Sequence, residues 1–227
     1  MADKEVAIIS ANLGNFDKEQ TVVRQTVGFD HIVYTDENFP PRSQSMSPRL
    51  QARIPKMFSW EMAPGYDYYI WVDSSCNVTN EGAIQWFIDQ LGSADAAFFK
   101  HPNRNTVQEE ADYLKKRLAK NCPYITPRYK GERIDDQLAV VDENAELLAS
   151  TAFIYRDTIR ARDLLTIWWL HTSLYHSIDQ LSLPHAIKSS GAEVDIIHED
   201  YTKIPWITYV RNKWPNYCLL HSKWNPS

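Results

Sequence analysis

The sequence predicts an α/β fold in which helices flank a mostly parallel central sheet. Short apolar runs rich in β-branched and aromatic residues alternate along the chain with longer segments of helical composition, which is the order expected for such a sheet. The chain has 227 residues and 44% hydrophobic content, which is enough to bury a full core. That core fits either one large α/β domain or two small ones.

Six segments have the composition of short buried strands. Val, Ile, Phe, Tyr and Trp fit the half-buried or fully buried surface of a sheet, and polar residues follow the first two runs. The expected strands are Glu5–Ser10, His31–Thr35, Tyr68–Asp73, Ala96–Lys100, Ala152–Tyr155 and Val194–His198. Together these segments can form one sheet.

Helical patterns fill the gaps between the strands. Thr106 and Glu109 form a capping box, and Asn80 and Asp157 are expected to cap two further helices. The expected helices are Leu50–Met62, Glu81–Leu91, the segment from Thr106 to Lys120, the segment that follows Asp157, and Asp179–Lys188. The segments expected to be loops are Asn121–Glu132 and Lys203–Ser227.

Composition and charge exclude several classes of protein. The chain has 24 basic and 29 acidic residues, so it lacks the basic excess of a nucleic-acid binder, and a local cluster must hold any anionic ligand. The longest apolar run, Leu164–Leu170, is too short to span a membrane, and the first residues have no signal-peptide character. Three widely spaced cysteines fit reduced thiols. We therefore expect a soluble, cytoplasmic protein.

Familiar phosphate-binding and hydrolase signatures are absent from the sequence. The segment Ala11-Asn12-Leu13-Gly14 after the first strand has a single glycine, so it is no GxGxxG, and no GxxxxGK[ST] occurs. No GxSxG or His-Glu-x-x-His occurs either. If phosphates bind here, we expect a metal ion and basic side chains to hold them.

Asp73 is the most informative single residue. It ends the aromatic and β-branched strand Tyr68–Asp73 and precedes Ser74 and Ser75. Ligands of open α/β sheets bind at the carboxyl ends of strands. A carboxylate beside hydroxyl groups suits Mg²⁺ or Mn²⁺ with positions left open for a diphosphate. The alternative is that Asp73 only caps a turn.

Four short motifs carry a family resemblance. They are Arg53-Ile-Pro-Lys56, Tyr69-Ile-Trp-Val-Asp73, Lys100-His-Pro-Asn-Arg104 with Glu109-Glu110-Ala111, and Ile178-Asp-Gln-Leu-Ser182. In this order, over roughly Ala7 to Ile197, they resemble the glycosyltransferase-like family that includes the plant pectin and seed-mucilage glycosyltransferases. The chain is also similar to the N-terminal domain of the chlorovirus glycosyltransferase that glycosylates the capsid, which implies the host cytoplasm as its location if the chain is virus-encoded.

The resemblance implies a GT-A fold in a single domain over residues 1–227, with a nucleotide-binding half over about 1–100 and an acceptor half over about 101–227. It implies transfer of a sugar from a nucleoside diphosphate donor, UDP-linked, to a hydroxyl of a glycan or glycoprotein, with Mn²⁺ or Mg²⁺ as cofactor. The alternatives are a nucleotide-sugar hydrolase or nucleotidyltransferase, and a carbohydrate-binding module without turnover.

The resemblance also implies roles for particular residues on the donor side. Base and ribose contacts fall to four residues at the ends of the first two strands: Ser10, Asn12, Thr35 and Asp36. Arg53 and Lys56 are expected to face the diphosphate, on the helix face that also carries Arg49. Lys100, His101 and Arg104 are expected to line the sugar pocket, with a solvated loop as the alternative.

For the metal, the resemblance implies Asp73, with Ser75 where many members of the wider fold have a second acid. His221 and His198 are rival candidates for a further ligand. Asp179, beside Gln180, is expected at the reaction centre, although an aspartate there also suits a helix cap. Aromatic residues of the C-terminal segment can stack on an acceptor glycan: Trp206, Trp214 and Trp224.

Overall fold

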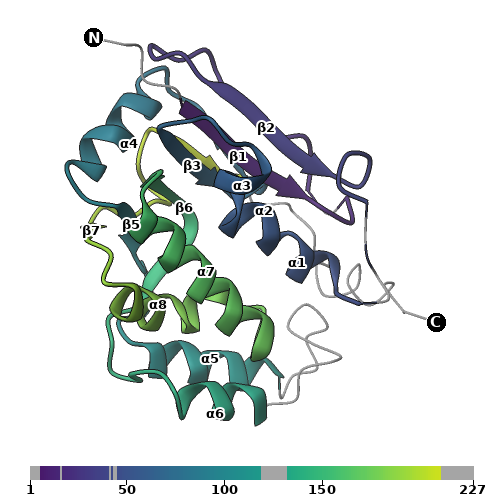
Figure 1. The fold of residues 1–227 in the computed structure, drawn as a ribbon, viewed down its shortest axis with the longest axis vertical. Coiled ribbons are helices and arrows are strands. Elements are labelled where there is room, and N and C mark those ends of the chain that lie inside the picture. The colour runs from purple at the N-terminus through teal and green to yellow at the C-terminus, as the bar shows by residue number, and fades with distance from the viewer. Residues whose placement is uncertain (1–5, 16, 41, 43–44, 119–131, 211–227) are drawn as a thin grey trace.

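The computed structural model describes residues 6–15, 17–40, 42, 45–118 and 132–210, and it confirms the expected α/β architecture (Figure 1). Its central sheet has the strand order β2-β1-β3-β6-β5-β7. These strands are β1 Val6–Asn12, β2 Asp30–Thr35, β3 Tyr68–Val72, β5 Ala96–Lys100, β6 Leu148–Arg156 and β7 Val194–Ile197. β6 runs antiparallel to its neighbours β3 and β5, and the other neighbouring pairs are parallel. The sheet is therefore mostly parallel and contains strands from both halves of the chain.

Both faces of this sheet are covered, which explains the near-continuous apolar strands. Alternate residues of β1 point to opposite sides. Val6 and Ile8 pack in the cluster that contains α4 (Ala83–Leu91). Ala7 and Ile9 pack in the cluster that contains α7 (Ile159–Leu174) and α8 (Leu183–Ser190). Figure 1 shows α7 and α8 running across the near side of the sheet.

A third apolar cluster positions one turn of the site. It joins α5 (Val107–Leu118) and α6 (Glu132–Leu138) to the 3₁₀ turn η1 (Asp179–Leu181). Ile178 precedes this turn, and Leu181 is its last residue. The Thr106 hydroxyl accepts from the Glu109 N–H at 3.2 Å, so the expected capping residue does begin α5. The end of this expected helix, Lys120, lies outside the described residues.

The expected single helix Leu50–Met62 is wrong. The segment forms three short helices, α1 (Pro48–Gln51), α2 (Arg53–Met57) and α3 (Ser59–Met62). Pro55 has no N–H to bond to the carbonyl of Gln51, and Phe58 leaves the helical region at φ −125° and ψ 28°. The first break separates α1 from α2 and the second separates α2 from α3, and both α1 and α2 contribute to the site.

Other boundaries also differ from expectation. Thr158, rather than Asp157, caps α7, because its hydroxyl accepts from the Ala161 N–H at 3.1 Å while Asp157 pairs with Arg162. The expected helix Asp179–Lys188 is the turn η1 followed by α8. Two further strands were not expected, β4 (Cys76–Val78) and β8 (Ile207–Tyr209), which pair antiparallel. β8 lies in a segment predicted to be a loop.

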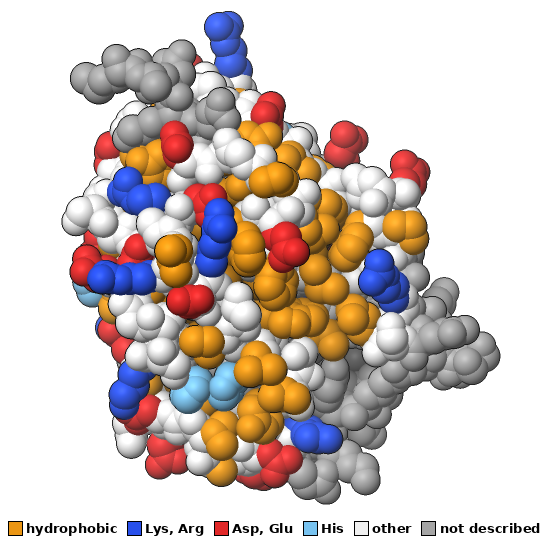
Figure 2. Space-filling model, in the orientation of Figure 1, with side chains coloured by type: hydrophobic (Ala, Val, Ile, Leu, Met, Phe, Trp, Pro, Cys, Tyr) orange, Lys and Arg blue, Asp and Glu red, His pale blue; other side chains and the backbone are white. Residues whose placement is uncertain are grey.

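The helical face carries a hydrophobic surface. Figure 2 shows hydrophobic side chains gathered on the side seen in Figure 1, and α7 exposes Leu170 and Leu174. Neither leucine lines the pocket described below. In the part of the chain that the structure describes, no helix has both the length and the apolar character needed to cross a bilayer.

Candidate active site

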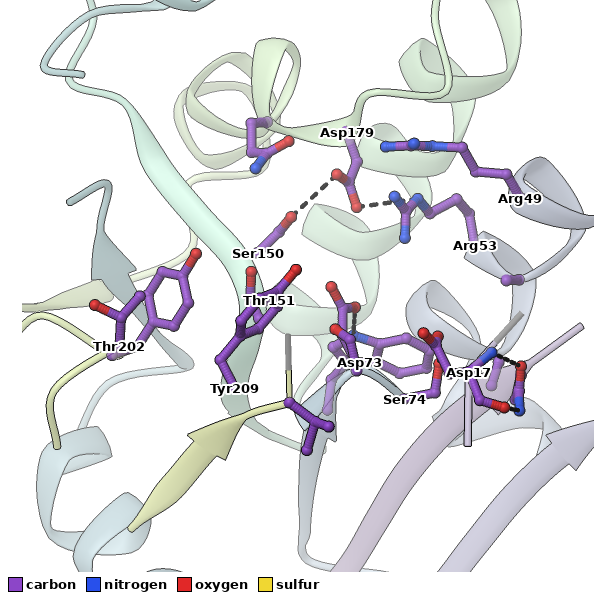
Figure 3. Close-up of a pocket in the computed structure, with 18 of the residues that line it drawn as sticks. Asp17, Arg49, Arg53, Asp73, Ser74, Ser150, Thr151, Asp179, Thr202 and Tyr209 are labelled. Carbon is purple, nitrogen blue, oxygen red and sulfur yellow. Dashed lines mark hydrogen bonds and ion pairs between the residues drawn. The ribbon is translucent and has the colours of Figure 1, made fainter. Parts of the chain in front are cut away.

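A pocket of about 1080 Å³ opens where β1 and β3 end (Figure 3). Because β6 is antiparallel to β3, Ser150 and Thr151 near the start of β6 lie beside the end of β3. Loops and short helices from both halves of the chain complete the walls. The polar and aromatic residues that line it include Asn12, Asp17, Arg49, Arg53, Trp71, Asp73, Ser74, Ser75, Asn103, Tyr113, Ser150, Thr151, Asp179, Gln180 and Tyr209.

Asp73 is held in a tight turn directly after β3. Its N–H donates to the carbonyl of Thr151 at 2.8 Å, and its own carbonyl accepts from the Cys76 N–H at 2.8 Å. The buried side-chain amide of Gln20 donates to the carbonyls of Val72, Asp73 and Cys76 at 2.7–3.3 Å. The backbone that carries this carboxylate is therefore fixed from three sides.

The two oxygens of the Asp73 carboxylate differ. Oδ1 accepts from the Trp71 indole N–H at 2.7 Å and lies 3.7 Å from Lys56 Nζ. Oδ2 makes no hydrogen bond to any described residue, and 31% of the side chain is exposed. One oxygen is thus held by the protein, and the other is available to a ligand in the pocket.

Asp179 lies on the opposite wall and is almost fully buried (Figure 3). Its Oδ2 lies 2.8 Å from Lys56 Nζ and 3.2 Å from Arg53 Nε, and its Oδ1 accepts from the Ser150 hydroxyl at 3.0 Å. The Trp168 indole N–H donates to the Asp179 carbonyl at 2.8 Å and fixes the turn.

The electrostatics of Asp179 follow from these partners. Burial opposes ionisation, but Arg53 and then Lys56 outweigh it and lower the pKa of Asp179 to about 2. The carboxylate is therefore anionic at neutral pH, and both of its oxygens are already engaged. Such a group is a poor proton acceptor.

Lys56 does not face the pocket, so the expectation that it contacts a diphosphate is wrong. The side chain is fully buried and is not part of the pocket lining. Its ammonium lies 5.5, 5.9 and 5.6 Å from the ring centres of Trp71, Phe153 and Trp168. Burial lowers the pKa of Lys56, while Asp179 and Asp73 act in the opposite direction.

Arg49 and Arg53 form a cationic wall instead. Both line the pocket from α1 and α2, and the Arg53 side chain is 11% exposed (Figure 3). Arg49 was not among the expected site residues, although its spacing of four from Arg53 was the signal for it. The pair gives the pocket the local positive charge that the overall composition lacks.

Asp17 is a pocket residue that the sequence did not indicate. Its Oδ2 accepts from the Ser74 hydroxyl at 2.6 Å, which brings a second carboxylate to the turn that carries Asp73. Asn12 fixes this loop, because its side-chain amide donates to the Asp17 carbonyl at 2.8 Å and accepts from the Asp17 N–H at 3.2 Å. The two segments are 57 residues apart, so no local pattern reports their contact.

Three residues expected to contact the base and ribose lie outside the pocket lining. Ser10 is fully buried, and neither Thr35 nor Asp36 lines the cavity. The Asp36 carboxylate accepts from the Gly14 N–H at 2.8 Å, where Gly14 adopts a positive φ of 82°. Asp36 therefore positions the loop after β1, and of the four residues only Asn12 lines the pocket.

The residues expected to line the sugar pocket, Lys100, His101 and Arg104, instead hold a loop in place. Lys100 pairs with Glu146 at 2.9 Å, away from the cavity. His101 Nδ1 accepts two backbone N–H groups of the loop, and burial together with Arg104 lowers the pKa of His101 to about 4. Arg104 pairs with Glu110. None of the three expected residues lines the pocket, whereas their neighbours do: Pro102, Asn103 and Tyr113.

The donor atoms near Asp73 fit a hard divalent cation. The described residues contain no group of three or more His, Cys, Asp or Glu side chains that could hold a metal ion. Asp73 Oδ2 and the hydroxyl-bearing Ser75 line the pocket, and Mg²⁺ or Mn²⁺ needs only one or two protein oxygens when a diphosphate supplies the rest. His198 is exposed and lies outside the pocket lining, and His221 lies outside the described residues.

Comparisons with known proteins give a family match and similar solved structures. The family model described as "TOD1/MUCI70, glycosyltransferase-like domain" matches residues 3–198. A solved apo structure of the bifunctional glycosyltransferase WbbM is similar at a TM-score of 0.48 and 12% sequence identity, over 86% of this chain and 39% of that chain. No curated protein matches the chain. Because the family model covers well over half of the sequence, the chain belongs to the TOD1/MUCI70 glycosyltransferase-like domain family.

Proposed function

We propose that this chain transfers a sugar from a nucleoside diphosphate donor, UDP-linked, to a hydroxyl of a glycan or glycoprotein, with Mn²⁺ or Mg²⁺. The observation that carries the proposal is one pocket lined by two arginines and by a strand-end carboxylate with an unengaged oxygen. Arginine groups bind phosphate oxygens in charge-assisted hydrogen bonds. Membership of a glycosyltransferase-like family supports sugar transfer as the reaction.

In this proposal the diphosphate lies between the arginines and Asp73. Arg49 and Arg53 neutralise its negative charge from one side. On the other side Asp73 Oδ2 and Ser75 would hold the divalent cation, which supplies positive charge to the leaving diphosphate when it is bound. Asn12 and the loop that it fixes form the adjoining wall. We expect the nucleoside to lie against this wall.

Asp179 acts through its charge rather than as a base. Its pKa is lowered to about 2 and both oxygens are engaged, so it is a weak base toward an acceptor hydroxyl at neutral pH. Its negative charge instead orients Arg53 and stabilises positive charge that develops on the sugar. Gln180, the next residue in the pocket, has an amide that suits sugar hydroxyl groups.

Two exposed aromatic rings on the pocket wall support a glycan acceptor. Tyr113 and Tyr209 line the pocket with exposed fractions of 38% and 45%. Exposed tyrosine rings offer an apolar face and a hydroxyl, which suits the face of a sugar ring. Trp206, expected in this role, stacks on Trp86 at 5.8 Å and packs against the core. Trp214 and Trp224 lie outside the described residues.

A screen of nucleotide sugars tests the proposal. The melting temperature of the chain should rise with UDP or a UDP-sugar, and more so with Mn²⁺, because a ligand that binds only the native state stabilises it. Release of UDP from the best donor should accelerate when glycan acceptors are added. If the rate of UDP release does not change with any acceptor, the chain is a hydrolase. If the nucleotide sugar binds but no UDP is released, the chain is a carbohydrate-binding module. Absence of any shift across the nucleotides would contradict the proposal.

A further inference from the structure

Lys56 is a buried cation that joins the two carboxylates of the site. Its ammonium lies 2.8 Å from Asp179 Oδ2 and 3.7 Å from Asp73 Oδ1, on the protein side of both side chains. No pocket surface reaches it, since the side chain is fully buried. Any effect of Lys56 on a ligand must therefore pass through Asp73 or Asp179.

The surroundings of this ammonium exclude a general packing role. Apart from the carboxylates it meets the rings of Trp71, Phe153 and Trp168, whose faces attract a cation but accept no strong hydrogen bond. A buried charge is costly unless it is paired. An apolar side chain would fill this aromatic space without that cost, so the charge itself is the feature that needs an explanation.

The contacts of Asp179 explain why a charged side chain is buried here. Asp179 Oδ2 is shared between Arg53, which lines the pocket, and Lys56, which does not. A diphosphate that recruits the Arg53 guanidinium weakens the Arg53 contact with Asp179. Lys56 stays behind as a counter-ion, so the carboxylate keeps its charge and its place while the ligand is bound.

We propose that Lys56 is a positioning residue of the site, which holds the Asp179 carboxylate anionic and in place beneath the reacting sugar. This inference rests on the proposed function of the same pocket. It assigns Lys56 no direct contact with the donor.

A double-mutant cycle between Lys56 and Asp179 tests the inference. Lys56→Met keeps the length of the side chain without its charge, Asp179→Asn removes the opposite charge, and the double variant removes both. The three variants are compared with the wild-type chain in melting temperature, in UDP affinity by calorimetry, and in kcat with the best donor.

The expected pattern separates folding from catalysis. Each single variant should melt about 10 °C lower, because it leaves a buried charge with fewer partners, and the double variant should recover much of that loss. The kcat should fall on the order of 10²-fold in Lys56→Met and stay at the level of Asp179→Asn in the double variant, since Lys56 acts through Asp179. UDP affinity should stay within about threefold throughout.

The matched control is Lys115→Met, which removes a lysine that pairs with Asp135 between α5 and α6, outside the pocket lining. It should leave both kcat and UDP affinity unchanged. A loss of UDP affinity on the order of tenfold in Lys56→Met, with unchanged kcat, would mean that Lys56 serves donor binding rather than the placement of Asp179, and it would overturn the inference. Multiplying losses of kcat in the double variant would overturn it as well.

Failure of the proposed function gives a different result. If the wild-type chain turns over no nucleotide sugar, the transferase proposal and the catalytic part of this inference both fail. The recovery of melting temperature in the double variant still decides, without any substrate, whether Lys56 is the counter-ion of Asp179.

Discussion

Lowering the pH from about 7 to about 5 should destabilise this protein through His176. The ring is fully buried between α7 and η1, and its Nδ1 accepts from the Ile178 N–H at 3.0 Å. Burial, and then the positive charge of Arg49, lower the pKa of His176 from 6.5 to about 3. The neutral ring therefore belongs to the folded state.

The sign and size of the effect follow from linkage. Because the pKa of His176 is lower in the folded chain than in the unfolded one, protons bind the unfolded chain first as the pH falls. Stability is lost below pH 6.5 and continues to fall until about pH 3. At about 1.4 kcal/mol per pH unit, the interval from pH 6.5 to 5 costs about 2 kcal/mol through this one ring. His101, whose pKa is lowered to about 4, acts in the same direction.

Urea unfolding at the two pH values measures this loss. His176→Asn keeps an acceptor for the Ile178 N–H, and it should lower stability at both pH values but reduce the pH-dependent loss by about 2 kcal/mol. His198→Asn changes an exposed histidine and should keep the wild-type loss. If His176→Asn loses as much stability between the two pH values as the wild-type chain, the buried neutral ring is not the cause.

Three further outcomes test the site. Asp73→Asn should abolish the Mn²⁺-dependent part of UDP binding with little change in melting temperature, and unchanged UDP affinity in calorimetry would remove Asp73 from the metal site. Arg53→Ala should weaken UDP about 10- to 100-fold but uridine much less, because a charge-assisted phosphate contact is worth about 1.5–3 kcal/mol, and equal losses would point to folding or to the base pocket. Tyr209→Ala should raise the KM for a glycan acceptor several-fold while the KM for the donor stays constant, whereas a loss confined to the donor would place this ring at the nucleotide end of the pocket.

Local patterns in the sequence were sufficient for the elements that carry Asp73. The aromatic and β-branched run before it predicts a buried strand, and β3 ends at Val72, one residue before the carboxylate. The Thr106 cap and the strands near the N-terminus were likewise found from neighbouring residues alone. Side-chain shape and capping chemistry act over a few residues, so a linear reading detects them.

Only the tertiary structure decided which charged residues share the pocket and which are enclosed behind it. The spacing of Arg53 and Lys56 predicts one helix face and one environment for both residues. In the structure Arg53 lines the pocket, whereas Lys56 is fully buried against Asp179. The approach of Asp17 to Ser74, the antiparallel course of β6 and the pairing of β8 with β4 also join distant segments. Whether a charged side chain is exposed to solvent or buried against a carboxylate depends on the packing of segments far apart in the chain. Neighbouring residues in the sequence do not report that packing.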